Sequence, residues 1–288
     1  APRRVAFDPQ TLETHGEFTF DDDITEHITA AHLIADPTHS ETIGFATQFG
    51  VSPQYHVYRL PVGGRHREVI ASLDARGPAY IHDCSVTDTH VILIESPLTL
   101  SALRALNPFS EGAIDMLRWD PDEPTRVLVV DRSSGDLVAD PTFGATFCFH
   151  HVNAYCDDGD VVVDLIEFPD SDIVGSPSLD ELDGTGSPDV PAGKLQRYRI
   201  DLTTNTVDRR PLYVGGMELP RVPQSRVGRP YRYAYGQATD RKRANGLVKV
   251  DCDTGQAIEW WEQGVYVEEP IPVQRPDGTA ADDGVVLA

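Results

Sequence analysis

The sequence predicts an all-β fold built from repeated antiparallel hairpins, and three observations support this prediction. Short runs rich in β-branched and aromatic residues recur along the 288 residues, with turn residues between them. Helical periodicity is scarce. Three turns share one form, in which an apolar run ends at an aspartate and returns after a polar turn. Repeated hairpins of this kind favour a β-propeller of four-stranded blades, with a β-sandwich as the alternative.

The expected strands follow one another along most of the chain. The three similar turns are DRSSG at Asp131, DLTTN at Asp201 and DCDTG at Asp251, where Asp, Ser and Thr cap the turn and Gly or Asn takes the positive φ. The segment 169–193 is rich in Asp, Ser, Pro and Gly and is expected to be a surface loop inside a single domain, 1–288, because strand patterns resume on both sides. The β-rich segments are 41–49, 54–61, 68–73, 79–95, 126–138, 146–168, 195–202 and 246–261.

One short segment, from Leu98 to Phe109, has a different pattern. Apolar residues recur there at three-residue intervals, at Leu100, Leu103, Leu106 and Phe109. This spacing predicts a short helix, one or two turns long, that packs against the core.

The charge balance argues against several classes of partner. The chain has 46 acidic and 24 basic residues, which gives a formal net charge of −22. Such a surface repels phosphate backbones, so nucleic acid is not an expected partner. Aspartate outnumbers glutamate and only three lysines are present. We interpret this as the solvated acidic surface of a protein from a salt-loving, halophilic organism rather than as a cation-binding face.

The four cysteines, Cys84, Cys148, Cys156 and Cys252, include no C-x-x-C pair, which favours a reducing cytoplasm. No apolar run is long enough to cross a bilayer. The sequence also lacks a G-x-S-x-G elbow, a phosphate-binding loop and an H-E-x-x-H pair. The sequence therefore contains none of these motifs for nucleophilic hydrolysis or nucleotide chemistry.

Three histidines, His32, His82 and His150, lie in strand-like segments and are candidate metal ligands. If the inner strands of successive blades bring them together on a propeller axis, their imidazoles suit iron. Two alternatives remain. Alternate residues of a strand share a face, so Cys84 with His82 and Cys148 with His150 would form a Cys2His2 zinc site. Otherwise each histidine is a hydrogen-bonded core residue.

Two glutamates, Glu218 and Glu269, have apolar and proline neighbours, in GGMELPRV and EEPIPV. Such surroundings are unusual for a solvated carboxylate. Metal-bound histidines normally donate their other ring N–H to an acceptor, and these two carboxylates are candidates for that role. Surface glutamates are the alternative.

From end to end, the chain resembles the carotenoid cleavage oxygenases, a family of non-haem iron enzymes. AAHLIADP around His32 is similar to the family's first histidine motif, and AYIHDCSVTDTHVILIESPL around His82 to the second. FCFHHVNAYCDDGDVVVDL resembles the third, in which the first of the paired histidines, His150, is the ligand. GGMELPRV, GRPYRYAYG, EEPIPV and ADDGVVLA are also similar to family motifs. Their order is more specific than any one of them.

The resemblance implies a seven-bladed β-propeller, of which this chain covers part, with Fe(2+) held on its axis by four histidines. Glutamates hydrogen-bond three of those histidines, and Glu218 and Glu269 fall on two glutamate positions. The third glutamate position falls at or just before Ala1, and the fourth histidine falls beyond Ala288. We therefore expect an internal fragment whose unpaired edges make it unstable or prone to aggregate, and which holds iron more weakly than the complete protein.

The function implied for the complete protein is cleavage of a carbon–carbon double bond of a carotenoid or apocarotenoid with O2, giving carbonyl products. The polyene would reach the iron through an apolar tunnel. The face from Leu98 to Phe109 would make a peripheral membrane contact. Two alternatives are a stilbene- or phenylpropanoid-cleaving oxygenase of the same family and a non-catalytic propeller that only binds.

Overall fold

The structure is a computed structural model that describes residues 2–36, 38–101, 114–175, 191–241 and 245–288. These residues form antiparallel β-sheets, and the predicted all-β class is confirmed. The helical elements of the described residues are three 3-10 helices of three or four residues, η1 (Ile114–Met116), η2 (Asp172–Gly175) and η3 (Gln224–Arg226). None of the described helices has the length and apolar character needed to span a membrane.

Four sheets of four or five strands form the blades of the described part of the chain. The first blade contains β3 (Ile28–Thr29), β4 (Ile34–Asp36), β5 (Glu41–Gln48), β6 (Gln54–Pro61) and β7 (Glu68–Asp74). The second contains β8 (Cys84–Val86), β9 (His90–Glu95), β12 (Thr125–Asp131), β13 (Leu137–Ala139) and β14 (Thr142–Phe143). The third contains β15 (Phe147–Asp157), β16 (Asp160–Phe168), β17 (Lys194–Asp201) and β18 (Thr206–Tyr213). The fourth contains β19 (Met217–Arg221), β20 (Tyr233–Ala238), β21 (Gly246–Asp251) and β22 (Ala257–Trp260).

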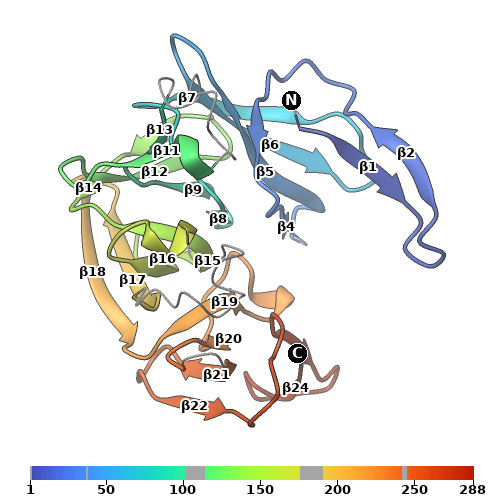
Figure 1. Ribbon diagram of the computed structural model, residues 1–288, viewed down its shortest axis with the longest axis vertical. Helices are drawn as coiled ribbons and strands as arrows, with labels where there is room; N and C mark the ends of the chain where they lie inside the picture. The colour runs from blue at the N-terminus through green and yellow to red at the C-terminus, as the bar shows by residue number, and fades with distance from the viewer. Residues whose placement is uncertain (1, 37, 102–113, 176–190, 242–244) are drawn as a thin grey trace.

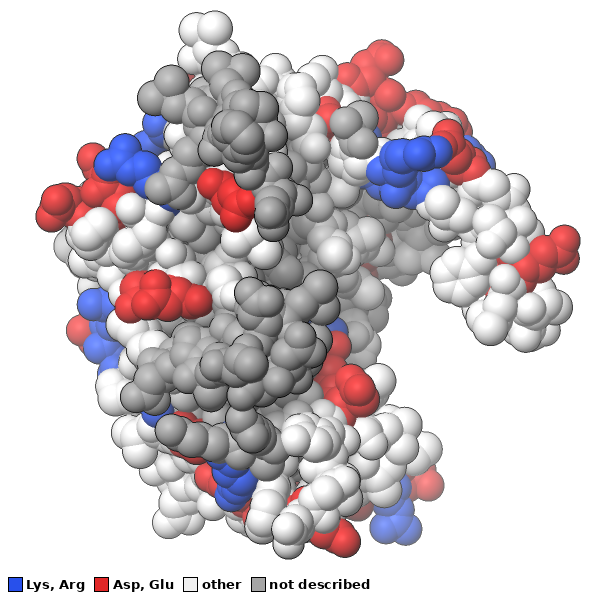
Figure 2. Space-filling view, viewed as in Figure 1, with Lys and Arg blue, Asp and Glu red and all other residues white. Residues whose placement is uncertain are grey.

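Three two-stranded sheets accompany the blades. They are β1 (Arg4–Phe7) with β2 (Thr14–Phe18), β10 (Leu98–Leu100) with β11 (Leu117–Trp119), and β23 (Ile271–Gln274) with β24 (Gly284–Leu287). Figure 1 shows the sheets following one another around an open arc, from the β1–β2 hairpin to the β23–β24 hairpin, with β4, β8, β15 and β19 facing its middle. Figure 2 shows the open side of the arc as a hollow, with acidic side chains scattered among basic ones rather than gathered into one patch.

The blades pack face to face, and the sequence of their middle strands reflects this. In β9, Val91 and Leu93 belong to the apolar cluster shared with the first blade, while Ile92 and Ile94 belong to the cluster shared with the third. Successive side chains of a strand point to opposite faces, so a strand buried on both faces needs an unbroken apolar run. The run VILI in β9 and the run VLVV in β12 meet this requirement.

The three hairpin turns predicted from sequence are confirmed. Asp131 and Asp201 each accept hydrogen bonds from the backbone N–H groups two and three residues further on, and Asp251 accepts one from the residue two further on. The positive φ falls where expected, at Gly135 (+77°), Asn205 (+54°) and Gly255 (+73°). These bonds are local, which is why the sequence identifies them.

The prediction of a helix from Leu98 to Phe109 is wrong for the first residues of the segment. Leu98–Leu100 is strand β10, which pairs with β11, and the Leu98 side chain is buried in the core between the third and fourth blades. Pairing with a neighbouring strand determined the conformation of this segment, and the three-residue spacing of leucines did not. Residues 102–109, and with them the expected lipid-facing surface, lie outside the described residues.

Arg132 joins the first and second blades. Its buried guanidinium donates to Asp36 Oδ2 at 2.8 Å, to Glu41 Oε1 at 2.6 Å and to the Thr87 carbonyl at 2.7 Å. Removing the cation would leave two carboxylates of the first blade without their counter-charge in a buried setting.

We predict that Arg132→Met lowers the free energy of unfolding by about 3–5 kcal/mol, measured by urea denaturation, because it leaves buried charges uncompensated. The control is Arg59→Met, which removes the exposed ion pair with Glu68 and should cost less than about 1 kcal/mol. A loss for Arg132→Met no larger than that for Arg59→Met would contradict the buried-network interpretation.

Candidate metal centre

The three candidate histidines lie within or just before the innermost strands of three successive blades. His32 lies two residues before β4, His82 lies two residues before β8, and His150 lies within β15. The pairing of β15 with β16 shifts register around His150, passing from Cys148↔Glu167 to His151↔Leu165. A bulge of this kind leaves a residue outside the ladder and changes the direction of its side chain. Each histidine is therefore placed where regular pairing is absent.

The imidazoles converge. Potential ligand atoms of His32, His82 and His150 all lie within 4.8 Å of one another, and this is the one such group of three or more found in the described residues. The Nε2 atoms of His32 and His82 are 3.1 Å apart. Two nitrogens each about 2.1 Å from one ion, and at right angles, would be roughly 3 Å apart. The residues present therefore fit a shared transition-metal ion.

Two of the rings have partners on their outer nitrogens. His150 Nδ1 donates to Glu218 Oε2 at 2.6 Å, and Glu218 lies in β19, the innermost strand of the fourth blade. His82 Nδ1 is 2.8 Å from the hydroxyl of Tyr80. A hydrogen bond at Nδ1 fixes the orientation of each ring and therefore the direction in which its Nε2 lone pair points.

Glu218 itself sits in an irregular part of its strand. The pairing of β19 with β20 shifts register between Glu218 and Arg221, and Leu219, between them, has a φ of +48°. A leucine rarely adopts this left-handed conformation, which costs about 1–3 kcal/mol. The N–H of Leu219 donates to Glu218 Oε2, and Glu218 Oε1 is a buried oxygen without a partner among the described residues. The backbone is thus strained where it presents the carboxylate to His150.

The protonation of the three rings follows from their surroundings. Burial, together with the neighbouring imidazoles, lowers the pKa of His82 to about 4, and burial also lowers the pKa of His32. Burial opposes the charged form of His150 too, but the hydrogen bond to Glu218 and its negative charge raise the pKa of His150. His32 and His82 are therefore neutral at pH 7, which is the form that binds a metal.

The other sequence-predicted residues have different surroundings. Glu269 Oε1 forms a 2.6 Å ion pair with Arg221, and its expected hydrogen bond to a histidine stays a prediction. The alternative Cys2His2 zinc site is wrong, because neither Cys84 nor Cys148 belongs to the group of converging ligand atoms found in the described residues. The shared-face argument failed since His82 precedes strand β8 and a bulge follows Cys148, so alternation does not extend to either histidine.

Tyr80 was missed by the sequence analysis. It lies two residues before His82 in AYIHDCSV, so closeness in the chain was the available signal. Neither residue lies in a regular strand whose alternation would have predicted the contact. The Tyr80 ring also stacks on Phe147, with centroids 6.4 Å apart and planes 22° from parallel.

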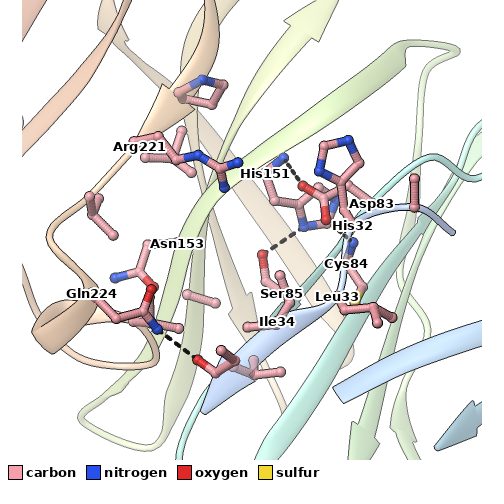
Figure 3. A pocket seen from close by; sticks show the side chains of 18 residues that line it. His32, Leu33, Ile34, Asp83, Cys84, Ser85, His151, Asn153, Arg221 and Gln224 are labelled. Atoms are coloured by element: carbon pink, nitrogen blue, oxygen red, sulfur yellow. Dashed lines mark hydrogen bonds between the residues drawn. The ribbon is translucent and has the colours of Figure 1, made fainter. Parts of the chain in front are cut away.

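A cavity of about 270 Å³ lies along the innermost strands and includes His32 in its wall. Figure 3 shows polar side chains around it, among them Ser85, Asn153, Arg221 and Gln224. The space is smaller than the usual 300–1,000 Å³ of pockets for drug-sized ligands, and its lining is not predominantly apolar. It does not correspond to the apolar tunnel expected for a polyene, which stays a prediction.

Comparisons with known proteins place this geometry in a family. A family model described as retinal pigment epithelial membrane protein matches residues 1–288. Carotenoid cleavage dioxygenase 8 of Arabidopsis thaliana is 30% identical over an alignment of 306 residues in length, which covers 99% of this chain and 53% of the relative. Apocarotenoid-15,15'-oxygenase of Synechocystis is 33% identical over 222 residues, which cover 73% of this chain and 43% of the relative.

Among solved structures, cobalt-substituted Synechocystis apocarotenoid oxygenase matches with a TM-score of 0.83 and 26% identity, over 98% of this chain and 60% of that one. The chain spans about half the length of the curated relatives it matches. The end-to-end family match and the arc of blades confirm both the resemblance found in the sequence and the propeller fold. The chain belongs to the retinal pigment epithelial membrane protein family, the family of the carotenoid cleavage oxygenases.

Proposed function

We propose that the protein is an Fe(2+)-dependent oxidoreductase, a dioxygenase that cleaves a carbon–carbon double bond of a carotenoid or apocarotenoid with O2 to give aldehyde or ketone products. The observation that carries the proposal is the convergence of His32, His82 and His150 from three blades. The names of the relatives, which include carotenoid and apocarotenoid oxygenases, support the substrate class.

In this proposal, His32, His82 and His150 hold the iron through neutral imidazole nitrogens, so that the ligands leave the charge of the ion uncompensated. The iron, when bound, would supply the redox chemistry that activates O2. Glu218 fixes the His150 ring by accepting its Nδ1–H, and the Tyr80 hydroxyl does the same for His82. Glu269, held by Arg221, is proposed to accept a hydrogen bond from a histidine of the same centre.

An apolar polyene is preferred over a stilbene-like phenol as the substrate. A phenolic substrate needs a group that helps to remove its proton, and the described residues offer no evident base beside the three histidines. Of the carboxylates near them, Glu218 accepts from His150 and Glu269 pairs with Arg221. Both oxygens of Asp83, which follows His82, accept backbone N–H groups. Position along the substrate path, rather than base catalysis, would then select the bond that is cut.

Metal analysis tests the centre directly. We expect iron near one equivalent per chain after reconstitution with Fe(2+) under anaerobic conditions. His150→Ala should abolish iron retention, whereas His151→Ala, which removes a ring that bonds Ser85 rather than the metal, should weaken it by no more than about tenfold. Zinc or no metal in the purified protein would favour a binding-only propeller, and equal loss from both variants would mean that the wrong histidine was chosen.

The orienting role of Glu218 gives a second test. Glu218→Gln replaces the charged acceptor of the His150 Nδ1–H by a neutral amide and should weaken Fe(2+) binding about 10- to 100-fold, measured by competition with a chelator. The matched control is Glu259→Gln, which removes a carboxylate bonded to Tyr213 and Arg241 on β22, the strand of the fourth blade farthest from β19, and should leave binding unchanged. An unchanged affinity in Glu218→Gln would contradict the orienting role.

The reaction itself is tested with an apocarotenal and 18O2. We expect two carbonyl products with label from O2 when the protein is loaded with iron, and none under anaerobic conditions or in His150→Ala. Turnover of a stilbene in place of every polyene tested would overturn the substrate assignment while leaving the metal centre intact.

A further inference from the structure

The residues that follow two of the proposed ligands contact each other across the blades. Asp83 follows His82, and His151 follows His150. Asp83 Oδ2 accepts the backbone N–H of His151 at 2.9 Å, while its Oδ1 accepts the N–H of Cys84 at 2.7 Å. Strands β8 and β15 belong to different sheets and share no ladder, so this carboxylate supplies a backbone connection that sheet pairing does not.

A second hydrogen bond lies beside the first. Ser85 Oγ is 2.7 Å from His151 Nδ1, and both side chains are buried. Figure 3 shows the two bonds together, at the wall of the cavity that includes His32. Polar groups in a buried setting are costly to separate from their partners, so the pair of bonds resists relative movement of the two strands.

We propose that Asp83, Ser85 and His151 form an interblade clamp that holds His82 and His150 at the separation a shared metal requires. The proposal rests on the metal centre of the proposed function. These are positioning residues: both oxygens of Asp83 accept backbone N–H groups, and neither Asp83 nor His151 belongs to the group of converging ligand atoms.

The need for such a clamp follows from the irregular strands. His82 precedes the paired part of β8, and β15 shifts register on both sides of His151, so ladder bonds do not fix either ligand. A metal site needs its ligands held within about 0.5 Å of the productive geometry. A contact one residue away from each ligand is short enough to transmit that restraint.

A purely structural role makes a different prediction. If the three residues only stabilise the fold, their removal should lower the unfolding temperature and leave the metal affinity and the ligand field of the folded protein unchanged. If they position the ligands, affinity and ligand field should change in protein that is still folded.

Cobalt(II) titration separates the two roles, because its d–d absorption reports the ligand geometry directly. Ser85→Ala removes one neutral bond without changing charge, so it should raise the Kd for Co(II) roughly three- to tenfold and shift the d–d bands. Asp83→Asn should raise the Kd by more, about 10- to 100-fold. The control is Asp164→Asn, which removes a buried carboxylate bonded to Arg197 and Tyr231 and should leave Kd and spectrum unchanged.

Each result of the cobalt titration either supports or overturns the clamp. Wild-type Kd and spectrum in folded Ser85→Ala and Asp83→Asn would overturn the clamp while leaving the metal centre in place. If Asp83→Asn does not fold, Ser85→Ala decides alone, and a wild-type spectrum in that variant overturns the proposal. If the unaltered protein does not bind Co(II), the metal centre itself fails, and the clamp fails with it.

Discussion

The candidate metal centre depends on the packing of one blade against the next. Its three histidines come from three different sheets, and these sheets share no hydrogen-bond ladder. Their relative positions are therefore set by the apolar clusters between blades and by the few polar bonds that cross those clusters. The unbroken apolar runs of β9 and β12 supply the packing, because both faces of each strand are buried.

The same arrangement explains why the site is irregular. Regular pairing would direct each histidine along the normal of its own sheet, whereas a shared ion needs all three to point toward the axis. The register shifts in β15 and β19 and the left-handed Leu219 depart from regular geometry in the residues that carry or orient ligands. Strain of this kind persists only where the surrounding structure holds it, and here the neighbouring blades provide that support.

Some buried charged groups also connect neighbouring blades. The Arg132 guanidinium is shared by two carboxylates of the first blade and a carbonyl of the second, and the Asp83 carboxylate is shared by backbone N–H groups of the second and third. Such groups contribute little net stability compared with apolar packing, but their removal leaves a partner unsatisfied, so they specify one relative position of the blades. In a protein of net charge −22, these are two of the places where buried charge has a structural use, alongside ion pairs such as Arg197 with Asp164.

The sequence by itself determined the features that arise from local contacts. The turns at Asp131, Asp201 and Asp251, the succession of antiparallel hairpins and the identity of the candidate histidines were all accessible, because each depends on residues close together in the chain or on motifs in a fixed order. Tertiary structure decided the rest. Strand pairing overrode the leucine spacing at Leu98–Leu100. The shared face expected for the cysteine and histidine pairs failed because a bulge follows Cys148 and because His82 lies before β8. The contacts of Glu269 with Arg221 and of Asp83 with His151 join residues 48 and 68 positions apart. No local pattern encodes such pairs, since only the packing of whole blades brings their atoms within reach.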